Sequence, residues 1–257
     1  MPFIQVAGKR LEYERFGKSI DENPTLVFLH EGLGSLSMWR NFPEQVALKT
    51  GCSALAYSRA GYGNSDEAER PRSVAFMHQE AVQVLPEFLE KMQVREVLLV
   101  GHSDGGSIAL IYSAKPVVPV HALVLEAAHV FVEETTIQSI AALKEEYLHG
   151  NLKSRLAKYH PRTDETFLGW SDVWLRPEFV SWNIEEFLPQ INIPVLVIQG
   201  EQDRFGTVRQ VEAIQKGCAG PVETLLVPEC GHRPHREKPQ QTLERIVRFI
   251  DRNKSDG

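Results

Sequence analysis

The sequence predicts an α/β protein with a mostly parallel, twisted sheet, helices on both faces and a small helical insertion. Two observations carry this prediction. Short apolar runs recur along the chain and alternate with helical patterns, which is typical of parallel strands that helices cover on both faces. One long stretch, 131–190, interrupts the alternation and holds no convincing strand.

The elements follow in order along the chain. The opening stretch FIQVAGKRLEYERFG (3–17) alternates about a Gly-Lys turn and predicts a β-hairpin. Short apolar runs then predict six strands, at 25–30, 53–58, 96–101, 121–127, 194–200 and 223–228. Helical patterns between and after them include 73–92, 107–114 and 240–252. This alternation predicts a doubly wound sheet.

The helical stretch 131–190 holds three of the four tryptophans, Trp170, Trp174 and Trp182. Ligands of open α/β sheets bind at the carboxyl ends of the strands, so we expect this insertion to form a lid over that edge. The alternative is an extra helical layer with structural tryptophans. We therefore divide the chain into a first core part (1–130), the lid (131–190) and a second core part (191–257). Trp170 and Trp174 are candidate substrate-binding residues.

Composition narrows the classes of function. The net charge is −6 and no basic block appears, so we expect no nucleic-acid partner. No apolar stretch approaches the ~18–20 residues of a membrane span, and the opening residues lack the apolar run of a secretory signal. The three cysteines have neither CxxC spacing nor an even count, so we expect no disulfide framework, no zinc site and a cytoplasmic location.

The stretch VGHSDGG (100–106) carries the first candidate for chemistry. It follows an apolar run and precedes a helical pattern, so Ser103 is expected on a sharp strand–turn–helix connection that exposes its hydroxyl above the sheet. Gly101 and Gly105 are then needed because side chains there would clash where strand and helix crowd together. The alternative is a serine that only caps the helix.

A serine nucleophile needs a base, and the base needs an orienting acid. Asp203 follows the strand PVLVIQG and His232 follows the strand ETLLVP, each in the loop at a strand's carboxyl end. The order Ser103, Asp203, His232 is the order that strand–turn–helix nucleophiles of this kind use. Glu126 is the alternative acid and His235 the alternative base. We expect no metal and no cofactor.

Five segments resemble the α/β-hydrolase superfamily: LHEGLGS (29–35), YSRAGYGNSD (57–66), GHSDGG (101–106), IQGEQD (198–203) and ECGH (229–232). The resemblance covers essentially the whole chain and implies the α/β-hydrolase fold. Within the superfamily, the aspartate directly after Ser103 and the tryptophan-rich FLGWSDVWL (167–175) resemble the biphenyl-hydrolase-like serine hydrolases. The known activities of that family include hydrolysis of α-amino-acid esters.

An oxyanion hole needs two fixed N–H donors. One is expected from the backbone of Asp104, at the start of the helix after the nucleophile. The resemblance implies that the other is Gly32, with Leu33 as the alternative. Glu31 stands where the family commonly has glycine, so it either recognises a substrate or anchors the loop. The Asp104 side chain either complements the helix dipole or pairs with a cationic group of the substrate, as the resemblance implies.

These residues predict a serine hydrolase that cleaves a small-molecule carboxylic ester, with an α-amino-acid ester or a lactone as candidate substrates, through an acyl-enzyme. Glu31, Leu33, Trp170 and Trp174 are the candidate substrate-binding residues. One alternative is a C–C bond hydrolase of a β-diketone-like ring-cleavage product. The other is a non-catalytic protein that binds a small ligand under the lid. The expected partner is a small molecule, with neither a membrane nor a nucleic acid.

Overall fold

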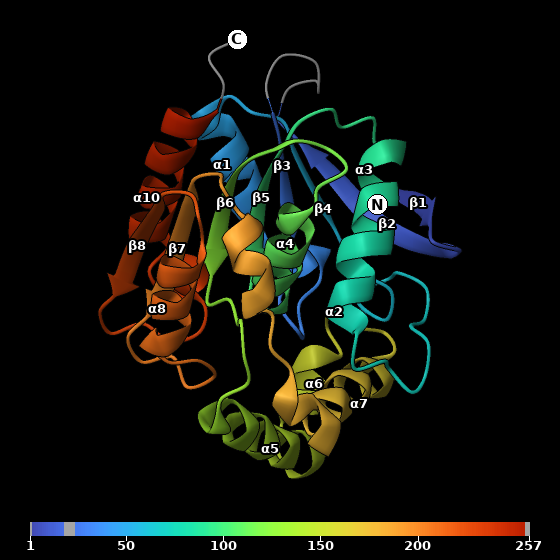
Figure 1. Ribbon diagram of the computed structural model, residues 1–257. Coiled ribbons are helices and arrows are strands. Elements are labelled where there is room, and N and C mark those ends of the chain that lie inside the picture. Colours follow the sequence, from blue (N-terminus) through green and yellow to red (C-terminus); the bar gives the residue numbers. More distant parts are fainter. Residues whose placement is uncertain (1, 18–23, 255–257) are drawn as a thin grey trace.

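A single twisted sheet of eight strands organises the part of the chain that the computed structural model describes, residues 2–17 and 24–254 (Figure 1). The strands lie in the spatial order β1-β2-β4-β3-β5-β6-β7-β8. Strand β2 is antiparallel to both β1 and β4, and all other neighbours are parallel. The strands are β1 (Phe3–Val6), β2 (Lys9–Phe16), β3 (Thr25–Leu29), β4 (Ala54–Tyr57), β5 (Val97–His102), β6 (Val120–Glu126), β7 (Val195–Gly200) and β8 (Val222–Val227).

Helices connect the strands and cover both faces of the sheet (Figure 1). The helices are α1 (Phe42–Thr50), α2 (Phe76–Gln79), α3 (Leu85–Lys91), α4 (Asp104–Ala114), α5 (Glu134–His149), α6 (Leu152–Leu156), α7 (Thr163–Trp174), α8 (Val208–Gly217), α9 (Pro234–Glu237) and α10 (Pro239–Asn253). A π-helical turn, Glu80–Val84, joins α2 to α3, so the helix expected at 73–92 is nearly continuous but not regular. The predicted α/β class, a mostly parallel sheet with helices on both faces, is confirmed.

Alternate residues of each central strand enter one of two cores, as the two-residue period of a strand requires. In β5, Leu98 and Val100 pack toward α1 and α10, whereas Val97 and Leu99 pack toward α3, α4 and α8. All six residues of β5 are buried, because helices cover both faces. The sheet is therefore a rigid platform for the loops that leave its carboxyl edge.

Helices α5, α6 and α7 lie beyond the carboxyl ends of the strands, in the segment between β6 and β7 (Figure 1). The later part of this segment returns to the sheet, where Phe179, Ile184 and Leu188 join the larger core. Its division from the sheet as a lid stays a prediction. In the described residues, no helix is both long and apolar enough to cross a bilayer.

Candidate active site

Ser103 occupies the turn between β5 and α4 with a backbone φ of 53° and ψ of −118°. Residues other than glycine rarely adopt a positive φ. Residues with such strained backbones concentrate at functional sites. The carbonyl of Ser103 accepts hydrogen bonds from the N–H groups of Gly106 (2.8 Å) and Ser107 (3.1 Å), which fix the first turn of α4. The strand, the turn and the helix thus hold Ser103 in place.

The glycines around Ser103 are required by packing. A Cβ on Gly101 would lie 2.4 Å from the backbone oxygen of Gly105, and a Cβ on Gly105 would lie 2.0 Å from the backbone oxygen of Leu29. The predicted reason for both glycines is confirmed, since either side chain would collide with backbone atoms. Helix α4 begins at Asp104, three residues before the helical pattern predicted at 107.

Asp203 and His232 meet in the loops after β7 and β8. The Nδ1–H of His232 donates to Asp203 Oδ2 at 2.7 Å, and Asp203 also accepts from Gln199 Nε2 and the Phe205 N–H, both at 2.8 Å. Burial alone would raise the pKa of Asp203, but the positive charge of His232 and these hydrogen bonds hold it below its usual value. A neutral His232 that donates from Nδ1 to Asp203 carries its lone pair on Nε2, so Nε2 is the nitrogen that can act as a base.

The alternative acid and base pair with each other instead. The Nδ1 of His235 lies 2.9 Å from Glu126 Oε2, and both side chains are buried. His235 lies outside the lining of the cavity that contains Ser103. Glu126 and His235 thus form a second acid–histidine pair that fixes α9 to the end of β6, since Glu126 also accepts the backbone N–H of His235 at 3.1 Å.

The loop after β3 makes a tight turn in which the N–H of Gly34 donates to the carbonyl of Glu31 at 3.1 Å. A Cβ on Gly32 would lie 2.0 Å from Nε1 of Trp170, so helix α7 packs directly on this loop. His160, just before α7, holds the same loop: its Nδ1 accepts from the Gly63 N–H at 3.0 Å and its Nε2–H donates to the Leu33 carbonyl at 2.9 Å.

Glu31 lies beside a buried histidine at the edge of the site. Its Oε2 is 3.4 Å from Nδ1 of His102, whose Nε2 contacts the backbone oxygen of His232 at 2.7 Å. Burial alone would raise the pKa of Glu31, but the charge of His102 holds it well below its usual range. Burial alone would lower the pKa of His102, but Glu31 raises it. This ion pair links the end of β5 to the loops after β3 and β8.

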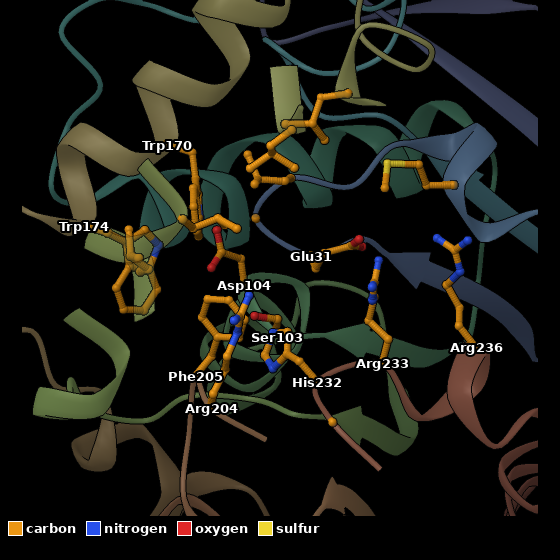
Figure 2. Close-up of a pocket in the computed structure, with 18 of the residues that line it drawn as sticks. Glu31, Ser103, Asp104, Trp170, Trp174, Arg204, Phe205, His232, Arg233 and Arg236 are labelled. Carbon is orange, nitrogen blue, oxygen red and sulfur yellow. The ribbon is translucent and has the colours of Figure 1, made fainter. Parts of the chain in front are cut away.

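A cavity of about 640 Å³ opens over Ser103 and His232, a size suited to a small molecule. Figure 2 shows Trp170 and Trp174 at one end, Arg233 and Arg236 at the other, and Ser103 with His232 between them. Every predicted site residue except Asp203 lines this cavity, and Asp203 lies behind His232, to which it is hydrogen-bonded.

Asp104 faces the tryptophan end of this cavity (Figure 2). The residue is 1% exposed, and among the described side chains its Oδ2 is a buried oxygen without a hydrogen-bond partner. Burial raises the pKa of the Asp104 carboxyl above its usual value, and Arg59 and Arg72 moderate the shift. A buried carboxylate without a donor is costly unless something else pairs with it.

Several residues that line the cavity were not predicted from the sequence, among them Arg233, Arg236, Phe205, His129 and Tyr159. Phe205 and the two arginines had a local signal, because they follow the candidate acid and base by one to four residues. His129 had none. Burial and the charge of His232 lower the pKa of His129 to about 4, so this histidine is neutral beside the catalytic candidates.

The comparisons with known proteins show the family and confirm the predicted α/β-hydrolase fold. A family model described as "Alpha/beta hydrolase family" matches residues 26–245, and the chain belongs to that family. It is a hydrolase. The serine hydrolase BPHL of Homo sapiens is 26% identical over 247 residues, which cover 90% of this chain and 80% of that protein.

Two further similarities differ in extent. The proline iminopeptidase of Lactobacillus delbrueckii subsp. lactis is 34% identical over 96 residues, 37% of this chain. The chain thus matches only 32% of the length of that relative. The crystal structure of the enol-lactonase from Burkholderia xenovorans LB400 superposes with a TM-score of 0.74 at 18% identity, covering 97% of this chain and 99% of that one. At this identity the likeness shows the fold.

Proposed function

We propose that the protein is a serine hydrolase that cleaves a small carboxylic ester through an acyl-enzyme. The observation that carries this proposal is that Ser103 and His232 line one cavity from two strand ends, while Asp203, after a third strand, contacts His232 at 2.7 Å. Nε2 of His232 takes the proton of Ser103 Oγ as Oγ bonds to the substrate carbonyl carbon. His232, stabilised by Asp203, then returns that proton to the leaving oxygen as its bond to carbon breaks. Water repeats the two steps and releases the acid.

The negative oxygen of the intermediate would lie between two backbone N–H groups. Asp104 is the first residue of α4, where helix geometry leaves the N–H without an acceptor inside the helix. Gly32 is the second donor and Leu33 its alternative, since both occupy the turn that the Gly34 N–H closes. Donors that are fixed before the reaction stabilise the developing charge without reorganisation.

The class of substrate that we propose depends on the side chain of Asp104. Its unpartnered carboxylate and the faces of Trp170 and Trp174 border the same part of the cavity. A carboxylate together with aromatic faces is a favourable environment for an ammonium group. This supports an α-amino-acid ester as the substrate, with the amine on the acyl part. A cytoplasmic location belongs to the same proposal and is supported by three free cysteines.

Replacement of Ser103 by alanine tests the reaction. We expect Ser103→Ala and His232→Ala each to lose at least ~10³-fold in turnover, because a nucleophile and its base act as a unit. Labelling of the parent, but not of Ser103→Ala, by a fluorophosphonate identifies the nucleophile directly. Near-normal turnover by either variant would show that Ser103 and His232 are not the nucleophile and its base.

A substrate screen separates the remaining classes of activity. It includes neutral esters, α-amino-acid esters, lactones, amides and a β-diketone-like ring-cleavage product, each measured with the parent and with Ser103→Ala. Preferential turnover of the ring-cleavage product would favour C–C bond hydrolysis. Binding of a ligand without any turnover would favour the non-catalytic alternative.

A further inference from the structure

The end of the cavity opposite Asp104 carries two arginines that form no ion pair with an acidic side chain in the described part of the chain. Arg233 directly follows His232, and Arg236 lies three residues further on, in α9. Both side chains line the cavity and are partly exposed (Figure 2). Within residues 2–17 and 24–254, neither guanidinium group has an ion pair or a side-chain hydrogen bond.

The acidic residues nearby already have partners. Glu31 contacts His102 at 3.4 Å, and Glu237 accepts the backbone N–H groups of Gly231 (2.7 Å) and Arg233 (3.1 Å). Glu146, further along the cavity wall, pairs with Arg155 at 3.3 Å. Arg233 and Arg236 therefore leave positive charge available at this end of the cavity. Arg204 and Lys158 line other parts of the same cavity and, among the described residues, also form no ion pair.

The charges at this end also repel one another. Burial, followed by the positive charges of Arg40 and Arg233, lowers the pKa of Arg236, and Glu31 opposes this shift only in part. Arginine nevertheless stays protonated in proteins. Two like charges held together at a cavity wall favour a ligand that carries the opposite charge.

The reaction geometry assigns this end to one part of the substrate. His232 delivers the proton to the leaving oxygen, so the leaving group must lie beside the His232 ring. Figure 2 places Arg233 and Arg236 on that side of Ser103, away from Trp170 and Trp174. A group on the alcohol part of an ester would reach the arginines, whereas the acyl part would face Asp104.

We propose that Arg233 and Arg236 form a subsite for an oxyanion group, a carboxylate or a phosphate, on the leaving alcohol of the substrate. This proposal rests on the proposed ester hydrolysis and deepens it. Guanidinium groups bind such anions through paired, charge-assisted hydrogen bonds. The substrate would then be an ester with a cationic amine on its acyl part and an anion on its alcohol part.

Matched leaving groups test the subsite by kinetics. We compare alanyl esters of 4-hydroxybenzoate and of 4-hydroxyphenyl phosphate with the alanyl ester of the neutral 4-hydroxybenzamide. In Arg233→Gln/Arg236→Gln, the ratio of kcat/KM for an anionic ester to that for the neutral ester should fall at least about tenfold relative to the parent. If the ratio for the carboxylate ester falls more than the ratio for the phosphate ester, the subsite prefers a carboxylate. The reverse result shows that it prefers a phosphate. The proposal is overturned if both ratios equal those of the parent.

Arg155→Gln is the matched control, because Arg155 lines the same cavity but is paired with Glu146. Its ratios should stay those of the parent, and a fall as large as in the double variant would overturn the assignment to Arg233 and Arg236. In the parent, added salt should reduce the ratios, because it screens charges that are partly exposed.

A binding measurement separates this subsite from the reaction itself. Calorimetry of benzoate and phenyl phosphate with Ser103→Ala needs no turnover. We expect binding of at least one anion, weakened about tenfold when Arg233→Gln and Arg236→Gln are added. If the parent hydrolyses no ester, the proposed function fails, while this measurement still supports or overturns the subsite. Undiminished binding in the triple variant overturns it.

Discussion

At the scale of single residues, Asp104 combines two separate contributions to the site. Its backbone N–H begins α4 beside the nucleophile, and its side chain places an unpartnered oxygen in the cavity. The first contribution is independent of the side chain, because every residue except proline has an N–H group. The two can therefore be separated by a substitution that changes only the carboxylate.

Asp104→Asn should reduce kcat/KM for α-amino-acid esters about 10- to 100-fold and should leave matched neutral esters nearly unaffected. A charge-assisted contact with an ammonium group is lost, at about 1.5–3 kcal/mol, while the N–H donor stays in place. Steady-state kinetics on alanyl and propionyl esters of one alcohol measure the difference. Equal losses on both esters would leave Asp104 with only its role at the start of the helix.

The two acid–histidine pairs differ in what they contact. Asp203→Asn should lower kcat about 10³-fold or more, because the amide no longer fixes the tautomer of His232 or stabilises its charge. Glu126→Gln should lower the melting temperature, since it weakens the buried contacts of His235, but should retain most of kcat. Assays beside thermal melts test both. A larger loss of kcat in Glu126→Gln than in Asp203→Asn would show that Glu126 is the catalytic acid and that Asp203 has the structural role.

At the scale of the elements, the predictable features were those with a local cause. Six strands were recognisable because each is a short apolar run, the opening hairpin because it alternates about a turn, and the turn at Ser103 because its glycines must sit where strand and helix meet. The contacts of His160 with Gly63 and Leu33 join residues about a hundred positions apart in the chain, and no local pattern encodes such contacts. The partner of Glu31 was left open for the same reason.

The junction of β5 and α4 should tolerate no side chain at Gly105. Gly105→Ala places a Cβ 2.0 Å from the Leu29 carbonyl, a backbone atom that the sheet holds, so we expect a loss of about 3 kcal/mol or more in the free energy of unfolding. The control is Gly169→Ala in α7, where the nearest atoms lie 4.0 Å away. The free energy of unfolding of that variant should rise by up to about 1 kcal/mol, because alanine has a higher helix propensity than glycine. Denaturation in urea measures both, and similar values for the two would refute the packing argument.

The Glu31–His102 pair should make stability depend on pH. The pKa of His102 is raised above 6.5, so its stabilisation is complete below pH 6.5 and is lost as pH rises through the raised value. The pKa of Glu31 is lowered below 4.5, so its contribution is present above pH 4.5 and is lost as pH falls through the lowered value. The difference in unfolding free energy between the parent and Glu31→Gln should therefore be largest between pH 4.5 and 6.5. A difference independent of pH would show that the pair is not charged.

At the scale of the whole molecule, the segment 131–190 shares a core with the sheet. Trp174 is 1% exposed, its ring centroid lies 4.7 Å from that of Phe179, and both belong to the same apolar cluster as Leu125 of β6. A segment that packs in this way is expected to unfold together with the sheet rather than as an independent domain.

Trp174→Ala should therefore lower the stability of the entire protein, by about 3–5 kcal/mol, and calorimetry should still record one transition. Val180→Ala is the control in the same segment, because Val180 is 57% exposed and should change stability by less than about 0.5 kcal/mol. An early, separate transition in Trp174→Ala would show that the segment is an independent unit.

His160 has a consequence for how molecules enter and leave. This one imidazole ties the start of α7 to the turn that is proposed to supply an oxyanion donor. If α7 swung away to admit a substrate, it would pull His160 from the Leu33 carbonyl and release that turn. An open form produced in this way would lack a fixed oxyanion donor and would be inactive. A substrate that enters without moving α7 would leave this turn, and the donor proposed for it, in place through successive turnovers.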